Sequence, residues 1–92
     1  MLWDITWEPR SEEDGGGYYV IAKGLDGSRR PGSKVILQVS PIIAKTMTER
    51  FDLSVLSGKV ESYLEQELFK GNLAAGQAIS VDEKLAKKIL EY

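Results

Sequence analysis

"YYVIAKGLDGSRRPGSKVILQVS", residues 18–40, holds two strand-like runs joined by turn residues. Residues 18–25 and residues 33–40 are rich in β-branched and aromatic side chains, and glycine, aspartate and proline lie between them. Two such runs separated by turn-forming residues are typical of a β-hairpin. We therefore predict that the first half of the chain is built around this hairpin.

The alternation of side chains indicates which face of the hairpin is buried. In the second run, Val35, Leu37 and Val39 share one side, and Lys34, Ile36 and Gln38 share the other. Successive side chains of a strand point to opposite faces of the sheet. We expect the valine and leucine side to face the core.

Residues 2–8, "LWDITWE", predict a third strand that precedes the hairpin. Trp3, Ile5 and Trp7 alternate there with two acids and a threonine, so the apolar side joins the same core face. Residues 9–17, "PRSEEDGGG", combine proline, three acids and three glycines, which is typical of a flexible, solvated loop. The three acids lack the ligand spacing of a calcium loop, so we predict no metal site there.

Helical periodicity begins directly after the hairpin. Ser40 and Pro41 suit the N-cap and the first position of a helix of about ten residues. A second helix is predicted from residue 54 by a stripe of apolar residues, namely Leu56, Val60, Tyr63, Leu64 and Leu68, and Gly71 with Asn72 would end it.

A third helix is predicted at the end of the chain, after a linker of small residues at 72–79. Ser80 and Glu83 have the spacing of a capping box, and Val81, Leu85 and Ile89 follow at spacing four. The predicted fold class is therefore α+β, with an N-terminal three-stranded antiparallel sheet and about three helices packed on one face. Residues 1–92 form a single small domain in this prediction, and residues 41–92 are its helical half.

Composition narrows the functional classes. The chain contains no cysteine and no histidine, which excludes thiol nucleophiles, zinc–thiolate sites and every catalytic triad that needs an imidazole. No phosphate-binding loop or dinucleotide fingerprint occurs. We predict no catalytic residues, no cofactor and no metal, and an enzyme is the third choice. No signal sequence or membrane-spanning segment is recognisable, so a cytoplasmic location is the default expectation.

Charge is unevenly distributed along the chain. Residues 1–14 carry five acids against one arginine, residues 15–50 carry six bases against two acids, and residues 51–92 carry five bases against seven acids. The basic middle segment holds the candidate contact residues for a polyanion or a partner's carboxylates, namely Lys23, Arg29, Arg30 and Lys34. The alternative is that these charges only solvate a long hairpin turn.

Four aromatic residues form a second candidate surface, namely Trp3, Trp7, Tyr18 and Tyr19. The tryptophans could form an apolar contact on an edge strand, or they could belong to the core. Tyr18 and Tyr19 are adjacent, so in a regular strand they point to opposite faces and one of them is a candidate exposed contact.

The resulting functional hypothesis is a small non-catalytic protein-interaction module, such as an adaptor, inhibitor or accessory protein of bacterial or phage type. Its partner is expected to be another protein, with self-association through the first strand or the C-terminal helix as one form. The alternative hypothesis is a nucleic-acid-binding domain that uses the basic hairpin loop.

Overall fold

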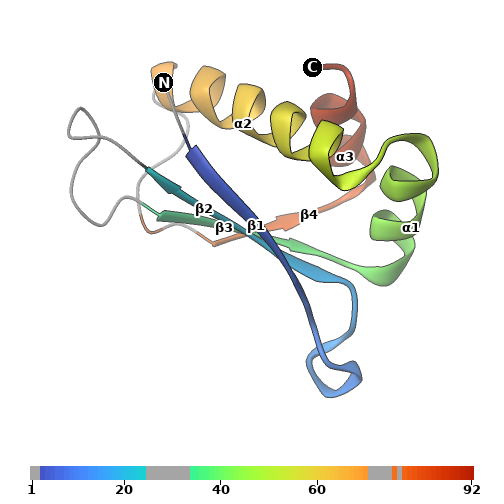
Figure 1. Cartoon of the computed structure of the whole chain (residues 1–92). Coiled ribbons are helices and arrows are strands. Elements are labelled where there is room, and N and C mark those ends of the chain that lie inside the picture. Colours follow the sequence, from blue (N-terminus) through green and yellow to red (C-terminus); the bar gives the residue numbers. More distant parts are fainter. Residues whose placement is uncertain (1–2, 25–33, 71–75, 77) are drawn as a thin grey trace.

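A computed structural model describes residues 3–24, 34–70, 76 and 78–92, and Figure 1 shows their arrangement. The elements in chain order are β1 (Trp3–Pro9), the short 3-10 helix η1 (Glu12–Asp14), β2 (Tyr18–Gly24), β3 (Lys34–Val39), α1 (Pro41–Arg50), α2 (Leu53–Phe69), β4 (Ala78–Val81) and α3 (Glu83–Leu90). None of the helices in these ranges is long and apolar enough to cross a membrane.

The α+β class is confirmed, but the prediction of a purely antiparallel three-stranded sheet is wrong. The sheet has four strands in the order β1-β2-β3-β4, and β4 runs parallel to β3 while the other pairs are antiparallel. A parallel neighbour needs a long crossover connection, and here that connection contains α1 and α2. Four residues without a hairpin turn give little local signal, so the pattern of these residues resembles a linker followed by a helix start.

The fourth strand also corrects the start of the last helix. Val81 is the last residue of β4, and because it is 6% exposed its side chain is part of the core. Asp82 is the N-cap of α3, because its Oδ1 accepts a hydrogen bond of 2.7 Å from the backbone N–H of Leu85. The predicted capping role of Ser80 is therefore wrong, since that residue lies within β4.

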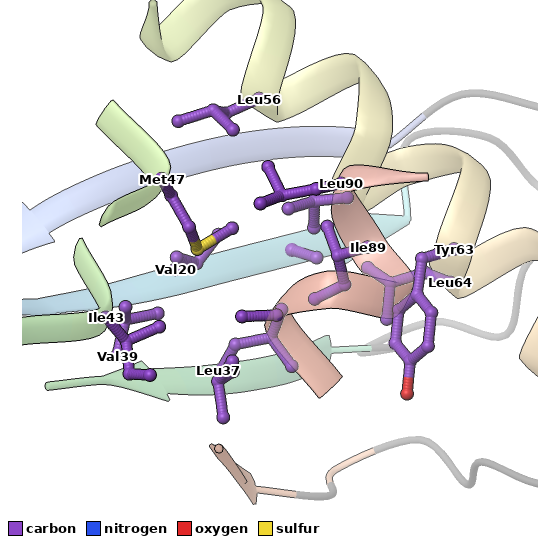
Figure 2. Packing of buried hydrophobic residues seen from close by; sticks show 14 of the residues in the cluster. Val20, Leu37, Val39, Ile43, Met47, Leu56, Tyr63, Leu64, Ile89 and Leu90 are labelled. Atoms are coloured by element: carbon purple, nitrogen blue, oxygen red, sulfur yellow. The ribbon is translucent and has the colours of Figure 1, made fainter. Parts of the chain in front are cut away.

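All three α-helices lie on one side of the sheet, as predicted (Figure 1). Ser40 caps α1 and Pro41 opens it, also as predicted. Figure 2 shows the core between the two layers, where strand side chains meet helix side chains. Its largest fully buried members are Leu37, Met47, Leu56, Leu64, Ile89, Val20, Val35, Val39 and Val60. The predicted valine and leucine face of β3 is therefore the buried face.

The helix α2 begins at a cap that the sequence pattern did not reveal. Asp52 Oδ1 accepts hydrogen bonds from the backbone N–H of Val55 at 3.0 Å and from the hydroxyl of Ser54 at 2.8 Å. These bonds favour the carboxylate and lower the pKa of Asp52, the bond from Val55 contributing most. The predicted end of this helix at Gly71 and Asn72 lies outside the described residues.

Candidate interaction surface

The second face of the sheet carries no helix in the part of the chain that the structure describes (Figure 1). We call this surface the open face. The strand register arranges its side chains in three rows across the sheet. These rows are Asp4, Lys23 and Lys34; Thr6, Ile21, Ile36 and Ala78; and Glu8, Tyr19, Gln38 and Ser80.

Apolar side chains occupy the centre of the open face. Ile21 and Ile36 are direct cross-strand partners on β2 and β3, and both are half-buried although no described helix covers them. Tyr19 lies beside them, one row along β2, and is also half-buried. Aromatic and β-branched side chains in neighbouring positions of a sheet pack against one another. The centre is therefore an apolar platform made by the sheet itself.

Arg10 joins the turn after β1 to the open face. Its guanidinium carbon lies 4.8 Å from the centre of the Tyr19 ring, within the range of a cation–π contact. The same guanidinium donates a hydrogen bond through Nη2 to the backbone carbonyl of Asp14, at the end of η1. Tyr19 is thus stacked under a fixed cation, and one side of its ring is already occupied.

Charged groups of both signs lie on the open face. Asp4 and Glu8 lie exposed on β1, and Lys23 and Lys34 lie exposed on β2 and β3. Lys23 is the cross-strand partner of both Asp4 and Lys34, so one row contains an acid followed by two bases. With the Arg10 guanidinium over Tyr19, the surface therefore presents two acids and three cations around its apolar centre.

The structure brings together only part of the predicted basic group. Lys23 and Lys34 are cross-strand neighbours and both are exposed. Arg29 and Arg30 lie outside the described residues. The hypothesis that these four residues bind a common partner stays a prediction.

The four predicted aromatic contacts are divided between two faces. Trp3 is 6% exposed and belongs to the core. Trp7 and Tyr18 also pack against the core, with their ring centres 5.7 Å apart in an edge-to-face arrangement. Trp7 Nε1 donates a hydrogen bond of 2.9 Å to Ser57 Oγ on α2. Only Tyr19 lies on the open face, because it alternates with Tyr18 along β2.

Sequence reasoning missed the central position of Ile21 and Ile36 on the open face. The available signal was the alternation itself, which put Ile36 on the side away from the valine and leucine face. An isoleucine on a solvent-facing row is informative only when its cross-strand neighbour is known. That neighbour follows from the register of β2 against β3, which pairs Ile21 with Ile36.

The titratable groups with shifted pKa values belong to the helical layer. Burial raises the pKa of the Tyr63 phenol, and the nearby Glu67 carboxylate adds to the effect. The hydrogen bond to Glu67 raises the pKa of Lys88, whose Nζ lies 2.5 Å from Glu67 Oε1. These contacts join α3 to α2, so packing between the two helices accounts for both pKa shifts.

Among the described residues, no group of three or more acidic side chains lies close enough together to hold a metal ion. No protein-family model matches the chain, and comparisons with curated proteins and with solved structures give no match either.

Proposed function

We propose that this chain is a non-catalytic protein-interaction module and that the open face is its contact surface. The observation that supports the proposal is the platform of Tyr19, Ile21 and Ile36, which the described helices leave uncovered. An apolar centre inside a polar rim is the usual anatomy of a protein–protein contact. The polar rim here is supplied by β1, by the ends of β2 and β3, and by β4.

The charge pattern favours a protein partner over a polyanion. Two acids, two lysines and Arg10 surround the platform, so charges of both signs are mixed on the described part of the open face. A phosphate backbone would meet Asp4 and Glu8 as well as the two lysines, and repulsion would offset much of the attraction. A protein surface that carries both signs can complement this pattern.

Nucleic-acid binding is the alternative, and the adjacent Lys23 and Lys34 are the observation in its favour. With Arg29 and Arg30, these residues would make four phosphate contacts. Four contacts predict that log affinity falls with log salt concentration with a slope of about −3.6. An affinity that does not change with salt, or that survives replacement of both arginines by alanine, would reject this alternative.

The experiment is affinity capture from the lysate of the native host, with and without nuclease, using three forms of the protein. The test form carries Ile21→Ser and Ile36→Ser on the open face. The control form carries Ile42→Ser on α1, because Ile42 is 77% exposed and lies on the helical side. We expect a stoichiometric protein that survives nuclease, is retained by the control, and is reduced at least about tenfold by the test form.

Two results would contradict the proposal. Equal capture by the test form and the native protein would show that the open face is not the contact surface. Capture that disappears with nuclease would favour nucleic-acid binding as the function. Circular dichroism of the test form must match that of the native protein, since both isoleucines also pack within the sheet.

A further inference from the structure

In the part of the chain that the structure describes, the outer edge of β1 has no neighbouring strand. The strand order β1-β2-β3-β4 makes β1 and β4 the two edge strands. β1 has seven residues and β4 has four. A long edge strand presents backbone donors and acceptors that can pair with an added strand, and proteins usually block such edges.

The hydrogen bonds at the two ends of β1 show which amides point outward. The backbone N–H of Arg10 donates to the Gly17 carbonyl at 3.0 Å, on the side of β2. Trp3, at an odd position, instead donates its N–H to Glu61 Oε2 at 2.9 Å. Backbone groups alternate sides along an antiparallel strand, so the N–H groups of Ile5 and Trp7 point away from β2. Within the described residues these two N–H groups have no partner.

Acidic side chains follow this edge. Asp4 and Glu8 lie on either side of Thr6 on the open face, and all three are exposed. Beyond the end of the strand, η1 adds the exposed Glu12 and Glu13. An added strand would place its side chains directly beside these carboxylates, where opposite charges attract and like charges repel.

The acids also disfavour one pairing of this edge with a second copy of the chain. One antiparallel register of two β1 strands that uses both free amides sets Ile5 opposite Trp7 of the other copy. That register places Asp4 opposite Glu8 twice, once on each side of the symmetry axis. Carboxylates directly opposite each other destabilise a strand pair.

We infer that the β1 edge binds an extended segment of another protein that carries Lys or Arg at positions i and i+4. The segment adds a fifth strand, its backbone pairs with Ile5 and Trp7, and its two cations lie beside Asp4 and Glu8. Main-chain hydrogen bonds supply affinity in this mode, and the alternating cations supply selectivity. The inference does not depend on the platform of Tyr19, Ile21 and Ile36, since it uses only the outer edge of β1 and the two acids of that strand.

The test uses the capped peptide Thr-Lys-Val-Thr-Val-Lys-Thr and a control peptide with Glu at both Lys positions. Amide hydrogen exchange of the full chain is measured by NMR, with and without saturating peptide. We expect the basic peptide to slow exchange at Ile5 and Trp7 at least about tenfold, because these amides gain partners. Thr6 and Glu8, which already face β2, should change little, and the acidic peptide should have no effect.

Two variants with the same change in net charge separate edge recognition from general attraction. Asp4→Lys with Glu8→Lys should weaken the basic peptide on the order of tenfold and permit the acidic peptide to bind. Glu12→Lys with Glu13→Lys should leave the affinity within about twofold, because these residues lie beyond the strand. Equal losses in both variants would overturn the inference.

Other outcomes would also overturn it. Peptide-induced shifts at Ile21 and Ile36 without protection of Ile5 would place the peptide on the open face. Protection of Ile5 that rises with protein concentration in the absence of peptide would show that a second copy occupies the edge. Either result is compatible with the proposed interaction function. The experiments therefore distinguish a wrong assignment of the β1 edge from a wrong assignment of the open face.

Discussion

Replacing Gly17 by alanine tests how the turn after η1 docks on the rest of the molecule. Gly17 has φ +75°, and an added Cβ would collide with the Val39 carbonyl oxygen. The same Cβ would lie 2.8 Å from the Ser40 carbonyl carbon and 3.0 Å from the Pro41 nitrogen. These atoms are backbone at the junction of β3 and α1, so they cannot rotate away. The turn or the junction must move.

Gly76 supplies the matched control. Its φ is +83°, close to that of Gly17, but an added Cβ there meets nothing within 4 Å. Both substitutions carry the cost of a left-handed alanine, about 1–2 kcal/mol, and both reduce the entropy of the unfolded chain similarly. Only Gly17→Ala adds the steric displacement, for which overpacking costs of about 1–3 kcal/mol are typical. The two variants should therefore differ in stability by about 1–3 kcal/mol.

The assay is urea unfolding of both variants, followed by tryptophan fluorescence. Trp3 is buried and Trp7 packs against the core, so their emission reports on the folded state. In thermal unfolding, the same difference lowers the midpoint of Gly17→Ala at least about 4 °C below that of Gly76→Ala, given about 4–8 °C per kcal/mol for domains of this size. Equal stabilities would refute the close approach of the turn to the junction.

Two further predictions concern the N-cap of α3 and the phenol of Tyr63 on α2. Asp82→Ala should lower the free energy of unfolding by about 1 kcal/mol in urea titrations, whereas Ser80→Ala should change it by less than about 0.5 kcal/mol, because only Asp82 caps the helix. Equal effects of the two substitutions would contradict the assignment of Asp82 as the N-cap. The raised pKa of Tyr63 means that its neutral phenol is favoured in the folded state. This contribution is complete below the unfolded pKa of about 10 and is lost as pH rises through the folded pKa, so stability should fall in alkaline solution. Tyr63→Phe should reduce that fall in pH-dependent unfolding, and an unchanged pH profile would contradict the assignment.

Local patterns in the sequence were sufficient for most of the core. The alternation of Val35, Leu37 and Val39 predicted the buried face of β3, and all three are 1% exposed. The helical spacing of Leu56, Val60, Tyr63 and Leu64 predicted the buried stripe of α2. Such patterns succeed because an element that buries one face must repeat apolar residues at its own geometric period. Caps are less regular, so Ser40 was identified and Asp52 was not.

The candidate surfaces could not be predicted without the register of the strands. Asp4, Lys23 and Lys34 are far apart in the sequence, and only the pairing of β1, β2 and β3 places them in one row. The Trp3 and Trp7 side chains had two possible roles in the sequence. Their position beneath α2, with the bond from Trp7 to Ser57, follows from how the helices cross the sheet.

Periodicity within single segments was sufficient to predict the α+β class, the central hairpin, the buried face of β3 and the first two helices. Tertiary structure alone decided the fourth strand. The segment Ala78–Val81 becomes a strand because α1 and α2 return the chain to the edge of β3, where its backbone finds parallel partners and Val81 enters the core. Among the described strands, that pairing leaves β1 as the longer of the two edge strands. Local spacing predicts neither outcome, because hydrogen bonds between distant segments have no counterpart in the pattern of one segment.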